Sequence, residues 1–510
     1  MKNMKTLLAL TVALALCLSA VSASACTAIY VGADLTADGS TMFARSEDIS
    51  NSYNKVFYAV PAGQHQAGEV YIGCYGFTYT FTRDSYGYTA FSDDNLSGVC
   101  PDCGGEHAHT PYQAGGTNEM GLTVSATETL GGASKAIKEV DPFNQDTGIE
   151  EAEIPTVLLS ECATAKEAVD LLLSIYDTVG AQAGSGIFIA DHNETWYVEN
   201  TTGTQYIALK LSESVAFAVP NQSAIGLIDL DDENVIASAN LIAVAKQAGT
   251  YVGDEEANTI DYIASYLPDQ KANSRYLSAL KHFSAAFDKA AEDVTAADYA
   301  ISNVDAEGNI VPFYTNSAVD RVFTLADVVA YYDIPGIGST GNLEIHIFQT
   351  FAEDSKTDTV EWVAMDDGCW SVFVPYYPML TTDVYAAYKV GTDAAKFVQE
   401  QPAEGLYYAT TGRIRDAEGN RITVEGFKVL PDKWADSMYW TFDALSNLCE
   451  YANVTDGQKA DIEAKLAELQ QQAYAAFEEM KANPDAAADI SMKTAEAVHA
   501  AVVELVNAIK

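Results

Sequence analysis

The sequence predicts an α+β fold in which strands form antiparallel hairpins and helices come in separate blocks. Two short apolar runs, at 186–191 and 195–199, flank the turn His192-Asn193-Glu194. Stretches with helical periodicity do not alternate regularly with such runs, as the βαβ units of a parallel sheet would. The chain has 510 residues, of which 48% are apolar, so it is long enough to bury a large core.

The first 25 residues are typical of a secretory signal peptide. Lys2 and Lys5 precede an apolar run over 7–21, and Ala23-Ser24-Ala25 has the A-x-A pattern of a cleavage site. Cleavage after this pattern would make Cys26 the first residue of the mature protein. We therefore expect an exported protein, located in the periplasm, the cell envelope or the extracellular space.

An N-terminal cysteine carries a nucleophile and a weak base on one residue. A thiol attacks as the thiolate, and an α-amine with a pKa of about 8 can accept its proton near neutral pH. The alternative from another class is a binding protein that is lipid-anchored through Cys26. That alternative is disfavoured because Ala23 stands where a lipobox usually has leucine, and lipidation would acylate the amine.

The residues after Cys26 predict a hairpin that returns two charged side chains to it. Apolar runs at 27–31 and 41–48 are joined through a D-G turn at 38–39. The second run contains Arg45 and Asp48. A cation beside the thiol favours the thiolate, and a carboxylate can hold the α-amine.

Together these features resemble the dipeptidases of peptidase family C69, which are N-terminal-nucleophile (Ntn) hydrolases related to bile-salt hydrolases and penicillin V acylases. The matching motifs follow one another between residue 26 and about residue 380. They are C-T-A-I-Y-V-G at 26–32, D-G-S-T at 38–41, A-R-S-E-D at 44–48, N-E-M-G-L at 118–122, S-A-T-E at 125–128, G-I-F at 186–188, W-Y-V-E at 196–199, P-N-Q at 220–222, N-S-R at 273–275, E-I-H-I-F-Q at 344–349, W-V-A at 362–364 and V-P-Y-Y at 374–377.

The resemblance implies an αββα sandwich of two antiparallel sheets between helical layers, and it implies further site residues. Asn221 matches an asparagine whose side-chain amide stabilises the oxyanion. The backbone N–H of Glu128 is the expected second donor, and Arg275 matches a second active-site arginine of the bile-salt hydrolase branch. The implied activity is hydrolysis of dipeptides without a cofactor. An amidase of the same superfamily, acting on conjugated bile salts or N-acyl amides such as penicillin V, is the alternative.

The sequence predicts a catalytic domain at 26–430, followed by a helical C-terminal extension at 431–510 that packs on it. Pro155 suits the first turn of a helix over 156–180, and Thr164 with Glu167 forms a capping-box pattern. The extension has apolar residues at helical spacing, interrupted at Pro484. Strands are also expected at 121–127, 206–211, 215–219, 344–351, 359–365 and 371–376, long loops with short strands at 71–117, and helices at 233–248 and 273–290.

The net charge of the chain limits the kinds of partner that it can bind. The formal net charge is −44, which argues against binding to nucleic acid or to anionic membrane surfaces. No segment after residue 25 has an uninterrupted apolar run of about 18 residues, so we expect no transmembrane helix. Small peptides are the expected partners, and homo-oligomerisation is left open.

Two motifs could suggest metals, and each has a simpler interpretation. Cys100 and Cys103 with His107 and His109 have ligand types for zinc, but a local disulfide is favoured in an exported chain. The acidic stretch at 229–233 lacks EF-hand spacing and suits a solvated loop. Besides Cys17 and Cys26 the chain has six cysteines, whose pairing the sequence does not determine: Cys74, Cys100, Cys103, Cys162, Cys369 and Cys449.

Overall fold

The computed structural model describes residues 26–48, 54–73, 76–93, 111–128, 130–316, 319–390, 434–451 and 454–509. The predicted signal peptide, the Cys100–His109 motif, Cys74 and the predicted domain boundary at residue 430 lie outside the described residues. The described cysteines, Cys26, Cys162, Cys369 and Cys449, are free thiols.

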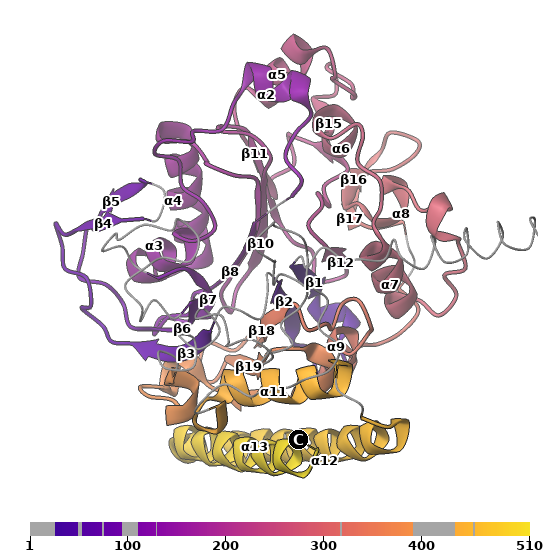
Figure 1. Ribbon diagram of the computed structural model, residues 1–510. Coiled ribbons are helices and arrows are strands. Elements are labelled where there is room, and N and C mark those ends of the chain that lie inside the picture. The colour runs from indigo at the N-terminus through magenta and orange to yellow at the C-terminus, as the bar shows by residue number, and fades with distance from the viewer. Residues whose placement is uncertain are drawn as a thin grey trace, which may run out of the picture.

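Two antiparallel sheets form the centre of the molecule (Figure 1). The six-stranded sheet has the order β12-β1-β2-β18-β19-β20, and the eight-stranded sheet has the order β14-β11-β10-β9-β8-β7-β6-β3. The first contains β1 (Thr27–Val31), β2 (Thr41–Asp48), β12 (Ala216–Val219), β18 (Asn342–Thr350), β19 (Thr359–Met365) and β20 (Val374–Tyr376). The second contains β3 (Lys55–Val60), β6 (Tyr88–Asp93), β7 (Gln113–Thr117), β8 (Thr123–Glu128), β9 (Ser185–Ala190), β10 (Thr195–Asn200), β11 (Tyr206–Lys210) and β14 (Val235–Ala237).

Aromatic side chains fill much of the space between the two sheets. The rings of Phe43 on β2 and Phe188 on β9 have their centroids 5.4 Å apart, and Phe188 also stacks with Tyr30 on β1. Polar contacts also cross this space; for example, Ser125 Oγ on β8 lies 2.8 Å from His346 Nε2 on β18. The strands are buried on both faces because helices cover the outer faces.

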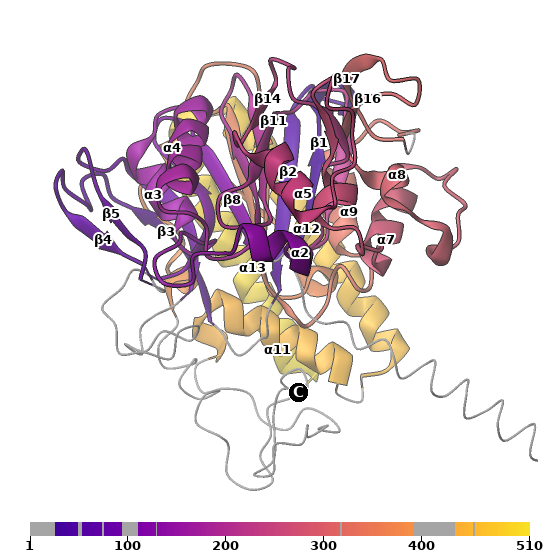
Figure 2. The ribbon, with the colours of Figure 1, turned by 90° about the horizontal axis from the view of Figure 1, so that it is seen from above.

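Helices cover the outer face of each sheet (Figures 1 and 2). The eight-stranded sheet is covered by α3 (Ile154–Glu161) and α4 (Ala165–Thr178), which contact β7 to β11. Side chains of α7 (Ser274–Phe283), α9 (Leu325–Tyr332) and α12 (Asp456–Ala482) share a core with the six-stranded sheet. The αββα layering and the α+β class are therefore confirmed.

Three C-terminal helices extend this second helical layer. The helix α11 (Met438–Tyr451) contacts β19, and α12 and α13 (Ala487–Ile509) contact each other and β20. The capping box of α12 joins Thr455 and Gln458, and the break between α12 and α13 falls at Pro484. No helix among the described residues is long and apolar enough to span a membrane.

The structure corrects three predicted helices. The helix predicted over 156–180 is two helices, because the hydroxyl of Thr164 caps α4 and separates it from α3. Residues 233–248 contain β14, whose valine and isoleucine favour a strand, and only then α5 (Leu241–Ala248). The helix predicted to reach residue 290 ends at Phe283, where Ser284 turns its hydroxyl to Asp320.

Short elements complete the fold around these layers. They are β4 (Val70–Ile72), β5 (Thr78–Thr80), β13 (Leu227–Asp229), β15 (Thr259–Asp261), β16 (Ser302–Val304), β17 (Ile310–Tyr314), α2 (Lys135–Val140), α6 (Tyr262–Tyr266) and α8 (Ala296–Tyr299).

Candidate active site

Cys26 immediately precedes β1, a strand in the interior of the six-stranded sheet, and is 7% exposed. The antiparallel register pairs Ala28 with Arg45 across the hairpin. As a result the Arg45 guanidinium reaches back to the cysteine, with Nη2 lying 3.4 Å from Cys26 Sγ. The hairpin expected from the sequence therefore brings a cation to the thiol.

Two residues that the sequence analysis missed hold this guanidinium. Arg45 forms a buried ion pair with Glu151, and its Nη2 donates to the hydroxyl of Tyr112 at 3.0 Å. The Tyr112 hydroxyl in turn donates to Glu151. Glu151 stands in an acidic run at 150–153, which in sequence looks like a solvated helix start. The structure buries it instead beside the arginine.

Burial, rather than Arg45, determines the net protonation of the cysteine. The pKa of Cys26 is raised to about 11, mainly by desolvation. The positive charge of Arg45 lowers this pKa, as expected, while the negative charges of Glu151 and Asp48 raise it. In the chain in which Cys26 is still joined to Ala25, the effect of burial therefore outweighs the thiolate-favouring charge of Arg45.

Asp48 lies at the end of β2, on the same hairpin. Its Oδ1 accepts a hydrogen bond of 2.6 Å from Asn342 Nδ2, a contact that no sequence pattern indicated. Burial raises the pKa of Asp48 to about 6, and the Asn342 hydrogen bond partly offsets this effect. Asp48 is near enough to raise the pKa of Cys26 by its charge.

Arg275 joins the other predicted residues to the start of β1. From the first turn of α7 its Nη1 donates to the carbonyl oxygen of Cys26 at 2.6 Å and to Thr27 Oγ1 at 2.7 Å. Its Nη2 donates to the Pro220 carbonyl at 3.0 Å and to Asn221 Oδ1 at 2.8 Å. Asn221 has a φ of 56°, a left-handed conformation uncommon for residues other than glycine and often found at functional sites.

Glu128 is positioned in the other sheet. It is the last residue of β8, and its backbone pairs with Ser185 on β9. Its role as the second oxyanion donor stays a prediction. Cys26, Arg45, Asp48, Asn221 and Arg275 are thus joined by described contacts or by electrostatic interaction.

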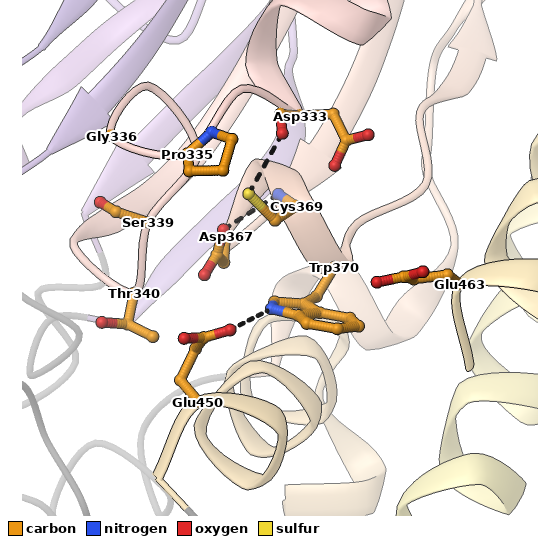
Figure 3. Close-up of a pocket in the computed structure, with 11 residues that line it drawn as sticks. Asp333, Pro335, Gly336, Ser339, Thr340, Asp367, Cys369, Trp370, Glu450 and Glu463 are labelled. Atoms are coloured by element: carbon orange, nitrogen blue, oxygen red, sulfur yellow. Dashed lines mark hydrogen bonds between the residues drawn. The ribbon is translucent and has the colours of Figure 1, made fainter. Parts of the chain in front are cut away.

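A cavity of about 530 Å³ lies near the loop that follows β19 (Figure 3). Carboxylates of Asp333, Asp367, Glu450 and Glu463 line it, together with Trp370 and Cys369. The Cys369 thiol donates to the Asp333 carbonyl at 3.5 Å. Among the described residues, no group of three or more His, Cys, Asp or Glu side chains is arranged to hold a metal ion.

The two stacked antiparallel sheets between helical layers define an Ntn-hydrolase fold. The model of peptidase family C69 matches residues 25–402, which begin one residue before Cys26 and include every candidate site residue. The chain belongs to peptidase family C69.

Several curated relatives of the chain are named as dipeptidases. The chain is 35% identical over 261 residues to probable dipeptidase B of Streptococcus pyogenes (50% of this chain, 49% of that one). It is 32% identical over 259 residues to a probable dipeptidase of Salmonella dublin (49% and 55%) and 31% identical over 221 residues to a dipeptidase of Bifidobacterium longum (41% and 39%). The chain spans about half the length of the curated relatives it matches.

Solved structures with similarity to the chain include an acylase and a hydrolase. Penicillin V acylase from Agrobacterium tumefaciens matches with 14% identity and a TM-score of 0.29, covering 68% of this chain and 85% of that one. A cysteine-to-alanine mutant of conjugated bile acid hydrolase from Clostridium perfringens matches with 12% identity and a TM-score of 0.31, covering 67% and 89%.

Proposed function

We propose that the chain is an exported cysteine dipeptidase whose nucleophile is Cys26, freed by cleavage after Ala25. One observation carries the proposal: the thiol of Cys26 lies 3.4 Å from Arg45 Nη2, while Arg275 links its carbonyl to Asn221. Membership of peptidase family C69 and similarity to proteins named dipeptidases support the substrate class.

Cleavage changes the chemistry of Cys26 because it replaces the peptide bond to Ala25 by an α-amine. That amine accepts the thiol proton, directly or through water. The carboxylate of Asp48 holds the amine in position. The sulfur attacks the carbonyl carbon of the dipeptide, and its oxygen becomes an oxyanion. The side-chain amide of Asn221 and a backbone N–H, for which Glu128 is our candidate, stabilise that charge.

Collapse of the tetrahedral intermediate breaks the peptide C–N bond, and the amine base returns its proton to the leaving amino group. The acyl group remains on Cys26 as a thioester. Water then adds to the thioester, and the N-terminal amino acid of the dipeptide leaves as a carboxylate while the thiol is restored. In this scheme Arg45 orients the sulfur, and Glu151 fixes Arg45.

The test combines the mass of the mature protein with a substrate panel. Protein exported by the producing cell should begin at Cys26 with a free amine and hydrolyse dipeptides in preference to N-acyl amides. A lipidated Cys26 would support the anchored binding protein instead, and turnover of bile-salt conjugates or penicillin V alone would support the amidase.

Cys369 provides a matched control for the nucleophile. Cys26→Ala should abolish turnover, whereas Cys369→Ala should retain it, because the Cys369 thiol donates to the Asp333 carbonyl and is not among the groups that act on Cys26. Full activity of the Cys26→Ala variant would refute the proposal.

A further inference from the structure

An irregularity in the β2–β18 pairing places an amide opposite Asp48. Glu344 pairs with Glu47, so a regular ladder would set Leu343 opposite Asp48. The register shifts between these positions, and Asn342 pairs with Asp48 instead. Such bulges commonly redirect a side chain beside an active site. The buried carboxylate therefore meets a hydrogen-bond donor where the regular register would give it a leucine.

The orientation of the Asn342 amide is fixed by its other hydrogen bonds. Its Oδ1 accepts from the backbone N–H groups of Ser339 at 2.9 Å and Gly368 at 3.2 Å. Its Nδ2 donates to the Ile337 carbonyl at 3.2 Å and to Asp48 Oδ1 at 2.6 Å. Because both N–H groups require the oxygen, the NH₂ group has to face the carboxylate. Asn342 is fully buried, so water does not compete for these bonds.

Two glycines let the surrounding loops approach this closely. A Cβ atom on Gly368 or on Gly338 would lie within 2.4 Å of the Tyr332 carbonyl oxygen. Gly338, Ser339 and Asp367 also line the cavity beside Cys369, so its wall includes the loops that hold Asn342 (Figure 3). Tyr332 itself donates to the Thr27 carbonyl at 3.1 Å, next to the nucleophile.

We propose that Asn342 is a positioning residue that holds the Asp48 carboxylate in place to receive the α-amine of Cys26. This inference rests on the proposed function of Cys26. The charged and titratable groups that act on or near Asp48 come from four elements or their ends: Cys26, Arg45, Arg275 and Tyr332. Without the hydrogen bond from Asn342, the Asp48 carboxylate would be free to rotate toward Arg45 or Arg275, away from the α-amine of Cys26.

The experiment is a double-mutant cycle on the mature protein with a dipeptide substrate. Asn342→Ala removes the donor. Asn342→Asp keeps an oxygen for the Ser339 and Gly368 N–H groups, but replaces the NH₂ group that donates to Asp48 and to the Ile337 carbonyl by a second carboxylate oxygen. Both variants should lower kcat about 10–100-fold and leave KM within about twofold, because Asn342 is fully buried and its proposed role acts through Asp48. In the Asp48→Asn background the same changes should have little further effect.

Asn303→Asp is the matched control. Asn303 on β16 is also fully buried, donates to Asp232 Oδ2 at 2.9 Å and accepts from the Asp229 N–H at 2.8 Å. The Asn303→Asp variant should have an unchanged kcat even if its melting temperature is lower. If Asn342→Ala does not fold, the comparison uses Asn342→Asp.

Several outcomes would overturn the positioning role. Equal losses of kcat in the wild-type and Asp48→Asn backgrounds would make Asn342 structural, and so would a loss of melting temperature without a change in kcat. An Asp48→Asn variant with normal kcat would show that the Asp48 carboxylate is not needed, and Asn342 would then have no carboxylate to position. In each case the nucleophile test stands apart, because the activity of the Cys26→Ala variant tests the proposed function and does not depend on the role of Asn342.

Discussion

Arg275 Nη2 donates to Asn221 Oδ1 at 2.8 Å, and this contact fixes which way the Asn221 amide faces. The oxygen accepts from the guanidinium, so the NH₂ group points away from it. The same guanidinium donates to the carbonyl of Cys26. One arginine thus links Cys26, the proposed nucleophile, to the candidate oxyanion donor and orients the amide so that its NH₂ group faces away from the guanidinium.

Asn221→Ala should lower kcat by about 10²–10³ and change KM much less, because the donor acts mainly on charge developed in the transition state. Asn221→Asp should lose at least as much kcat, since it keeps an oxygen for Arg275 but replaces the NH₂ donor by a carboxylate oxygen that repels the oxyanion. Steady-state kinetics on a dipeptide measure both. A change confined to KM would make Asn221 a binding residue.

Arg275→Lys should lower both activity and stability although the charge is kept. The guanidinium donates to four acceptors, and a lysine ammonium cannot reproduce this planar geometry. We expect a loss of about 1–3 kcal/mol in the free energy of unfolding. The exposed Arg83 is the control, and Arg83→Lys should be close to neutral in denaturant titration. Equal stability of the two variants would argue against the network.

Glu151→Gln and Arg45→Ala should move the pKa of the Cys26 thiol in opposite directions. The negative charge of Glu151 raises that pKa and the positive charge of Arg45 lowers it. In the uncleaved chain, with the thiol pKa at about 11, alkylation should accelerate roughly tenfold per pH unit from pH 7 toward that value. At pH 8 Glu151→Gln should react faster than the parent and Arg45→Ala more slowly.

The alkylation rates are measured by peptide mass spectrometry in a Cys369→Ala background, which removes the one described cysteine that is not buried. Glutamine keeps an oxygen for Arg45 and Tyr112, so this variant changes the charge with little change in packing. A shift of both variants in the same direction would mean that they act through the local fold rather than through charge.

The hairpin at Cys26 could be predicted because its determinants are local. Apolar runs, the D-G turn and the register they impose are enough to bring Arg45 back to the cysteine. Most strands of the two sheets could be predicted for the same reason. The split between α3 and α4 was missed although its signal was present: the capping pattern at Thr164 marks the start of a helix, which the prediction had placed inside one.

The contacts of Glu151 and Asn342 could not be predicted because they depend on tertiary packing. An acidic run before Pro155 is typical of the polar start of a helix, and nothing local indicates that Glu151 is buried against an arginine 106 positions away. Asn342 precedes the strand that the sequence predicts at 344–351, where an asparagine usually belongs to a turn. Its role depends on a bulge in the pairing of β18 with β2, which the local sequence does not indicate.

A buried carboxyl between the sheets should make stability fall as pH rises. Glu361 on β19 accepts a hydrogen bond of 2.6 Å from Thr89 Oγ1 on β6, and burial raises its pKa to about 8. In the unfolded chain the same group titrates near its ordinary value of 4.5. Between these two values the folded protein keeps a proton that the unfolded chain releases. The contribution of Glu361 to stability should therefore be greatest below about pH 4.5 and should fall as the pH rises toward 8.

Glu361→Gln should flatten this dependence because glutamine does not titrate. One proton contributes at most about 1.4 kcal/mol per pH unit, and Glu199 and Asp366, whose pKa values burial raises to about 7, should leave part of the slope. Melting temperatures between pH 5 and pH 8.5 measure the effect. The variant should match the parent near pH 5 and exceed it at pH 8, whereas Glu353→Gln on the exposed loop should follow the parent throughout. If the parent and the Glu361→Gln variant keep the same slope, Glu361 is ionised in the folded protein and the polar groups around it solvate its charge.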